Sequence, residues 1–268
     1  MKHGKINYVR LILSIVLAIL LLFLALGIGV QFGTNIKDWT KQTLDKLKPT
    51  QAETIDFSTL NYYAIGDSIT LGNVGGGQYT DKPYCTVVET LLGLNSSTNL
   101  GINGSVLANA GNKLQPMCLR YSDLENADII SIMGGTNDYN TSVPLGKVTD
   151  EDNTTFYGAL KVMCQGLKDE YSSAFIFFMT PLKAKKGEVT ENNAGLVNDD
   201  YRKAIFAVCA MYDIPVLDTA TLCDLEMEYG AGGYKGDGIH PSGYFHEHFI
   251  APVMADFIKQ NYTPTKTV

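Results

Sequence analysis

Short apolar runs alternate with segments of helical periodicity from about residue 58 to the end of the chain. The runs are bounded by turn residues and are apolar at consecutive positions, as in strands of a parallel sheet covered on both faces. They are Tyr62–Ile65, Thr98–Ile102, Ile129–Met133, Phe175–Met179 and Ile214–Leu217. Helices are expected between them over Tyr84–Leu92, Leu114–Leu124, Thr155–Glu170 and Tyr201–Tyr212. This alternation predicts right-handed crossovers and an α/β fold, a three-layer α/β/α sandwich with a parallel sheet of about five strands.

The last part of this domain is expected to be a closing helix over Gly243–Asn261, kinked at Pro252 because proline removes a helix hydrogen bond. We therefore place the folded domain at residues 58–262 and a short tail at 263–268.

A single long apolar block precedes the domain. Leu11–Val30 contains one polar residue, Ser14, and is long enough as a helix to cross the roughly 30 Å core of a bilayer. Basic residues lie before the block, so the positive-inside rule predicts a cytoplasmic N-terminus and an exported body. We expect a membrane anchor in residues 1–32 and a polar stalk in 33–57. A cleaved signal peptide, cut near Ala25 and Gly27, is the alternative, and it also exports the body.

The net charge of the chain indicates which kinds of partner it can bind. The chain has a formal net charge of -7, and its first ten residues carry three basic side chains and no acidic one, which leaves -10 for the rest. An acidic body argues against nucleic-acid binding, which needs clustered lysine and arginine.

The five cysteines form no C-x-x-C pair and lie at no metal-ligand spacing from histidine, and we expect them to be mostly buried apolar residues.

Reactive side chains follow the predicted strands. Ligands of open α/β sheets bind beyond the carboxyl ends of the strands. Ser68 stands there in Gly66-Asp67-Ser68-Ile69-Thr70, after the first run. It is a nucleophile only if a general base lies within reach, and the same residues could instead cap a helix.

His240 is the best candidate for that base. It lies in the glycine-flanked loop Gly236-Asp237-Gly238-Ile239-His240-Pro241, whereas His246 and His248 fall in the closing helix. Asp237 can fold back onto the imidazole, fix its tautomer and stabilise the imidazolium, as the acid of a Ser-His-Asp triad does. The alternative is that Asp237 caps a turn.

Donors for a developing oxyanion are available at the same edge. The backbone N–H of Ser68 is one, Gly104 in Asn99-Leu100-Gly101-Ile102-Asn103-Gly104 is a second, and the amide of Asn137 in Gly134-Gly135-Thr136-Asn137-Asp138 is a third. Each of these residues could instead serve only in a turn.

Taken together, these motifs resemble those of the SGNH (GDSL-type) hydrolases, over roughly residues 60–261. The resemblance implies a flavodoxin-like sheet, Ser68 as nucleophile and oxyanion donor, Gly104 and Asn137 as the other oxyanion donors, and Asp237 and His240 as triad partners. It implies no metal and no organic cofactor. The first motif ends Ser-Ile-Thr rather than Ser-Leu-Ser, which is a mild departure.

The sequence does not contain the motifs of three other classes of enzyme. The chain has no G-x-S-x-G nucleophile elbow. Gly72, Gly75, Gly76 and Gly77 lack the Lys-Ser/Thr of a phosphate-binding loop, and His246-Glu247-His248 is not H-E-x-x-H.

We therefore expect an extracytoplasmic, membrane-tethered serine esterase. Its expected substrate is a small ester or an acetylated glycan of the cell envelope. Alternatives are a lysophospholipase or lipase, a glycan O-acetyltransferase, and a non-catalytic glycan-binding module on the same scaffold.

Overall fold

The computed structural model describes Val16 and residues 55–109, 111, 114–122, 124–184, 188–223 and 237–264. The chain divides into two units, Met1–Thr54 and Ile55–Val268, and only the second is described beyond a single residue. The predicted anchor, its signal-peptide alternative and nearly all of the predicted stalk lie outside the described residues. Within the described ranges, no helix is both long enough and apolar enough to cross a membrane.

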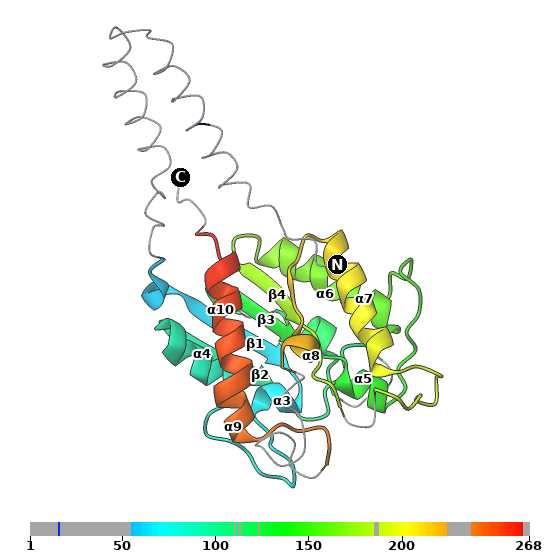
Figure 1. The fold of residues 1–268 in the computed structure, drawn as a ribbon. Coiled ribbons are helices and arrows are strands. Elements are labelled where there is room, and N and C mark those ends of the chain that lie inside the picture. The colour runs from blue at the N-terminus through cyan, green and yellow to red at the C-terminus, as the bar shows by residue number, and fades with distance from the viewer. Residues whose placement is uncertain are drawn as a thin grey trace, which may run out of the picture. The chain divides into compact units, whose positions relative to one another are not determined.

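The second unit alternates strands and helices (Figure 1). The strands are β1 (Asn61–Gly66), β2 (Ser96–Gly101), β3 (Ile129–Met133), β4 (Phe175–Met179) and β5 (Val216–Leu217). The α-helices are α3 (Ser68–Leu71), α4 (Tyr84–Leu92), α5 (Thr136–Asn140), α6 (Phe156–Glu170), α7 (Asn198–Met211), α8 (Thr219–Leu222), α9 (Gly243–Phe245) and α10 (Ala251–Asn261). The described residues also form short 3-10 turns η1 (Phe57–Thr59) and η2 (Met117–Leu119) and a π-helical turn η4 (His246–Ile250).

The five strands form one parallel sheet in the order β2-β1-β3-β4-β5. Gly66 at the end of β1 pairs with Gly101 of β2 and Met133 of β3, so the carboxyl ends of the three strands lie level. This register brings the loops that follow β1, β2 and β3 to one edge of the sheet.

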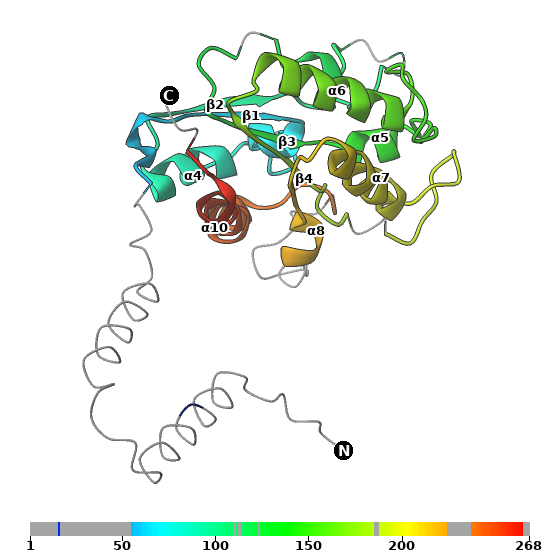
Figure 2. The same ribbon diagram turned by 90° about the horizontal axis from the view of Figure 1, so that it is seen from above.

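Helices cover both faces of the sheet. Figure 2 shows α6 and α7 on one face and α4 and α10 on the other. One apolar core lies under α6 and α7 and includes Ile130, Leu160 and Tyr201, and the other lies under α4 and α10 and includes Phe177 and Met254. The predicted three-layer α/β/α sandwich is therefore confirmed.

The longest helix of the described residues, α6, illustrates how the sequence forms these layers. The Thr155 side chain caps its first turn by accepting a hydrogen bond from the Gly158 N–H at 3.3 Å. Its buried residues recur at helical spacing and face the sheet: Phe156, Ala159, Leu160, Met163, Cys164 and Leu167. Truncating a fully buried leucine such as Leu160 to alanine typically costs about 2–5 kcal/mol of stability.

One predicted helix is wrong. Leu114–Leu124 contains only the turn η2 among its described residues. The Met117 N–H donates to the Val106 carbonyl at 2.8 Å and the Cys118 N–H donates to the Leu107 carbonyl at 3.2 Å. The segment therefore pairs with the loop after β2, and the helical hydrogen bonds of its described residues belong to the single 3-10 turn η2.

Two further details differ from the sequence prediction. Strand β5 starts at Val216 rather than at Ile214, since Pro215 has no N–H to donate to a sheet. The closing helix is interrupted by the π turn η4, and Pro252 lies in the first turn of α10, where a missing N–H costs nothing. The five cysteines, predicted to be mostly buried, are all buried, and all are free thiols.

Candidate active site

Ser68 is placed by a short helix at the end of β1. Asp67 caps α3, its Oδ1 accepting a hydrogen bond from the Ile69 N–H at 2.9 Å, and Ser68 is the first residue of the helix. A side chain at Gly66 would overlap Thr70, and one at Gly101 would overlap the backbone of Leu71. Both glycines therefore allow α3 to pack directly against the ends of β1 and β2.

The three predicted triad residues meet at this edge. The His240 Nε2 lies 2.9 Å from the Ser68 Oγ, and the His240 Nδ1 lies 2.7 Å from the Asp237 Oδ2. Ser68 is only 7% exposed, so its hydroxyl is largely shielded from bulk water. These contacts join residues from two distant parts of the chain into one hydrogen-bonded line.

The hydrogen bonds assign the protons. A carboxylate only accepts, so the Nδ1–H of His240 donates to Asp237 and the Nε2 accepts from the Ser68 hydroxyl. Burial acts to raise the pKa of Asp237, but hydrogen bonds from the His240 backbone and imidazole and from the Ile239 N–H outweigh it and lower the pKa. Asp237 therefore stays ionised and holds the imidazole in the tautomer that can take a proton from Ser68.

Gly104 lies in the loop that follows β2. The Ile102 N–H donates to the Gly66 carbonyl at 3.1 Å, which ties this loop to the end of β1. Gly104 has a φ of +69°, in the left-handed region that favours glycine. The site is solvent-accessible here, since Asn103 and Gly104 are both exposed.

Asn137 lies in the first turn of α5, beside the residue that precedes Ser68. Its Nδ2 donates to the Ser105 carbonyl at 3.0 Å and lies 3.4 Å from the Asp67 Oδ2. The first hydrogen bond fixes the amide. The second contact is long and therefore weaker than the first.

Two residues support the site, the buried Asp138 and the half-buried Arg120, and their roles were missed from the sequence. Asp138 was read only as part of the Gly-x-Asn-Asp motif, but it accepts hydrogen bonds from the Leu107 N–H at 2.9 Å and the Ala108 N–H at 3.2 Å. It thus holds the segment that follows Gly104, and burial raises its pKa to about 7. Burial likewise raises the pKa of Asp67 to about 6.

Arg120 is the second support. Its guanidinium donates to the Gly66 carbonyl at 2.7 Å and to the Leu100 carbonyl at 3.0 Å, so it bridges the ends of β1 and β2. Its charge also lowers the pKa of Asp67, although burial has the larger and opposite effect. No local motif marks this arginine, because its partners are distant in sequence.

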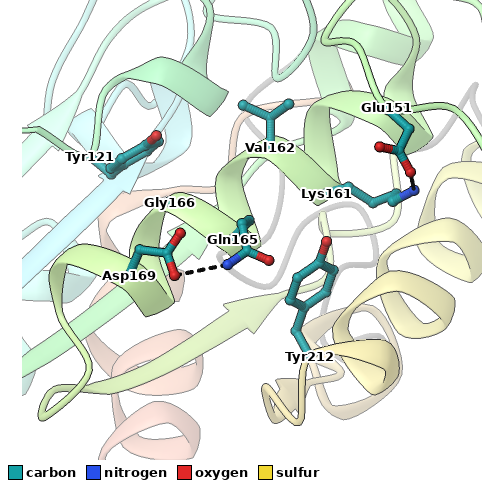
Figure 3. A pocket seen from close by; sticks show the side chains of 8 residues that line it. All are labelled: Tyr121, Glu151, Lys161, Val162, Gln165, Gly166, Asp169 and Tyr212. Atoms are coloured by element: carbon teal, nitrogen blue, oxygen red, sulfur yellow. Dashed lines mark hydrogen bonds and ion pairs between the residues drawn. The ribbon is translucent and has the colours of Figure 1, made fainter.

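A separate groove of about 380 Å³ runs along the outer surface of α6 (Figure 3). None of the triad residues lines it; its lining residues are Tyr121, Glu151, Lys161, Val162, Gln165, Gly166, Asp169 and Tyr212. Among the described residues, no group of three or more His, Cys, Asp or Glu side chains is placed to hold a metal ion.

Comparison with solved structures supports the fold. A protein from Lactobacillus plantarum is 27% identical, with a TM-score of 0.65 over 77% of this chain and 99% of the other. A possible lipase from Chitinophaga pinensis is 24% identical, with a TM-score of 0.60 over 75% and 98% of the two chains. A carbohydrate acetylesterase family member from Sinorhizobium meliloti is 14% identical, with a TM-score of 0.56 over 75% and 98%.

Comparison with protein families covers most of the domain. The search among curated proteins found no match. The model of the GDSL-like lipase/acylhydrolase family matches residues 64–248, which include Ser68, Asn137 and His240. The chain therefore belongs to the GDSL-like lipase/acylhydrolase family, the esterases and lipases that also carry the name SGNH hydrolases.

Proposed function

We propose that this protein is a serine esterase that removes acetyl groups from glycans through a covalent acyl-enzyme. The catalytic part of this proposal rests on the two hydrogen bonds that link Ser68 to His240, at 2.9 Å, and His240 to Asp237, at 2.7 Å. A serine, a base in hydrogen-bond reach and an acid that orients the base are the parts that acyl transfer requires.

The reaction follows from this geometry. The Ser68 Oγ attacks the ester carbonyl carbon while its proton passes to the His240 Nε2, and Asp237 stabilises the imidazolium. The backbone N–H groups of Ser68 and Gly104 and the amide of Asn137 bind the tetrahedral oxyanion. The bond to the alcohol then breaks as His240 returns the proton to the leaving oxygen. Water attacks the acyl-serine in the same manner and regenerates the enzyme.

A glycan ester is the favoured substrate for two reasons. Polar side chains lie next to Ser68 and Gly104, since the half-buried Asn73 donates its N–H to the Ser68 carbonyl and the exposed Asn103 precedes Gly104. The sequence between the strands has no long apolar segment that could form a lid over a lipid chain. The fold also serves a carbohydrate acetylesterase family member in Sinorhizobium meliloti, which is compatible with this substrate class.

The proposed location is the outer face of a cell membrane, with Leu11–Val30 retained as an anchor. Its support is the uninterrupted apolar block and the basic residues before it. Mass analysis of the N-terminus of the native protein tests this: an intact leader supports the anchor, and a mature N-terminus near Ile28 would show cleavage instead.

The substrate is tested with p-nitrophenyl esters from acetate to palmitate, assayed beside acetylated xylan and acetylated chito-oligosaccharides. We expect the highest kcat/KM on acetate and release of acetate from at least one glycan. An optimum at long acyl chains would point to a lipase, and acetyl transfer to an added sugar that outpaces hydrolysis would point to a transferase. Glycan binding without turnover of any ester would indicate a non-catalytic module.

A further inference from the structure

A polar and aromatic cluster lies beside the oxyanion loop. Its members are Asn73, Tyr79 and Asn103, which we call the Tyr79 cluster. The Asn73 Nδ2 donates to the Asn103 Oδ1 at 3.1 Å, and the Asn103 Nδ2 donates to the Tyr79 hydroxyl at 2.6 Å. The three side chains thus form one hydrogen-bonded unit from two separate loops.

The cluster adjoins the reacting groups directly. The Asn73 N–H donates to the Ser68 carbonyl at 2.9 Å, and Asn103 immediately precedes Gly104. The loop that carries Tyr79 then continues to Thr80, which lies against Gly243 at the start of α9, three residues after His240. Figure 1 shows α3 and α9 at the same end of the second unit. The cluster therefore lies beside Ser68 and Gly104, and its loop extends to the segment that follows His240.

The loop that presents Tyr79 is held in a defined shape. Asn73 and Tyr79 pair as an antiparallel bridge, and the Thr80 N–H donates to the Gly72 carbonyl at 2.9 Å. The tip is closed by a hydrogen bond of 2.9 Å from the Val74 N–H to the Gln78 carbonyl. Three consecutive glycines at the tip have positive φ, a conformation that larger residues adopt only with strain. An aromatic ring held in this way loses little freedom when a ligand binds.

The surface chemistry of the cluster suits a sugar. Tyr79 is 53% exposed, so its side chain offers an apolar ring surface to solvent next to Asn103. Among the contacts of the described residues, each of the two amides keeps one N–H unused, and the Tyr79 hydroxyl accepts a hydrogen bond and keeps its own proton to donate. A pyranose ring has an apolar C–H face and a rim of hydroxyls, which match an aromatic face flanked by amide and phenol donors. A lipid chain would leave these donors without partners.

We propose that the Tyr79 cluster binds the sugar ring whose ester Ser68 attacks, with the ring on Tyr79 and the hydroxyls on Asn103. This inference rests on the proposed esterase function. It adds a binding surface that selects a carbohydrate as the alcohol part of the ester. This surface contacts the sugar, which is the leaving group, and not the acyl group.

The test compares Tyr79→Ala and Asn103→Ala with wild type on p-nitrophenyl acetate and on the acetylated xylan or chito-oligosaccharide that wild type hydrolyses fastest. Phe206→Ala is the matched control, because Phe206 is an exposed aromatic residue, 42% exposed, on α7. We expect Tyr79→Ala to raise KM for the glycan by about tenfold or more, a change of about 1.4 kcal/mol, with a much smaller effect on p-nitrophenyl acetate. Tyr79→Phe should keep most of the affinity, because it retains the ring, and Phe206→Ala should change neither substrate.

The outcomes separate the two proposals. Equal losses on both substrates in Tyr79→Ala, or no loss on the glycan, would overturn the sugar site while leaving the esterase in place. Hydrolysis of p-nitrophenyl acetate by wild type, but of no acetylated glycan, would overturn both the glycan substrate and the sugar site. A melting temperature within a few degrees of wild type is required of every variant before its KM is compared.

Discussion

Replacing Asn137 by alanine tests whether its amide serves the reaction or only the fold. The structure gives this side chain two contacts, a hydrogen bond of 3.0 Å to the Ser105 carbonyl and a longer contact of 3.4 Å to Asp67. Both of these contacts hold the side chain within the folded protein. The catalytic role requires that one N–H turns to the oxyanion when the tetrahedral intermediate forms.

A loss of the structural role lowers the melting temperature, whereas a loss of the catalytic role lowers kcat. Losing the donor to a buried carbonyl costs about 1–3 kcal/mol of stability, which lowers the melting temperature by a few degrees per kcal/mol in a domain of this size. Losing an oxyanion donor costs about 10²–10³-fold in kcat, or about 2.7–4 kcal/mol, with little effect on substrate binding. A purely structural asparagine would show the first effect without the second.

The assay is kcat on p-nitrophenyl acetate, measured well below the melting temperature of the same preparation. Asn140→Ala is the control, since Asn140 is an exposed asparagine at the end of the same short helix. We expect Asn137→Ala to lose at least about 10²-fold in kcat, and Asn140→Ala to match wild type. An unchanged kcat in well-folded Asn137→Ala would remove Asn137 from the oxyanion site.

Asn137→Asp sharpens the same test. It places a carboxyl group against the Ser105 carbonyl and next to Asp67, whose pKa burial already raises to about 6. When ionised, this group opposes the negative charge of the transition state, so the variant should be slower than Asn137→Ala at neutral pH. When protonated, this group can donate a hydrogen bond to the oxyanion. The ratio of the kcat values of the Asp and Ala variants should therefore rise as pH falls, and a ratio that is constant with pH would contradict the electrostatic reasoning.

Two further predictions concern the histidines. Asp237→Asn should keep the fold and lower kcat by up to about 10⁴-fold, because the amide no longer holds the tautomer; a loss below about tenfold in steady-state assays would mean that another group orients His240. Burial lowers the pKa of His246 to about 4, against 6.5 in an unfolded chain, so the unfolded state takes up the proton first as pH falls. Stability should therefore decrease from about pH 6.5 to about pH 4, by up to about 3 kcal/mol from this residue. The raised pKa values of Asp67 and Asp138 act in the opposite sense, so the test is the difference in melting temperature between wild type and His246→Gln across this range. A difference that does not vary with pH would show that His246 does not contribute.

The sequence predicted the strands best where they are buried on both faces. The limits of β3 and β4 agree residue for residue with Ile129–Met133 and Phe175–Met179, because every position in those runs is apolar or packed between two layers. β2 was placed two residues late at its start, since it is an edge strand that begins with the polar Ser96 and Ser97. Hydrophobic runs do not reveal a strand that is only half covered.

The site was predictable to the extent that it depends on local motifs after strands. Ser68 stands directly after β1, where the sheet topology predicts reactive residues, and Asp237 and His240 lie together in a glycine-containing loop before the closing helix. Arg120 could not be found in this way. It bonds to carbonyls 20 and 54 residues away, and it lies in a segment whose apolar spacing imitated a helix. Such contacts become visible only when the whole fold is known.

The most direct test of the proposed chemistry is to trap the acyl-enzyme. Protein quenched with acid during turnover of p-nitrophenyl acetate is digested, and the peptide that contains Ser68 is analysed by mass spectrometry. The account predicts an acetyl group on Ser68 during turnover, a larger acetylated fraction if Asp237→Asn slows deacylation more than acylation, and no adduct and no activity in Ser68→Ala. Hydrolysis that persists in folded Ser68→Ala, or an acetyl group on a different residue during turnover, would contradict it.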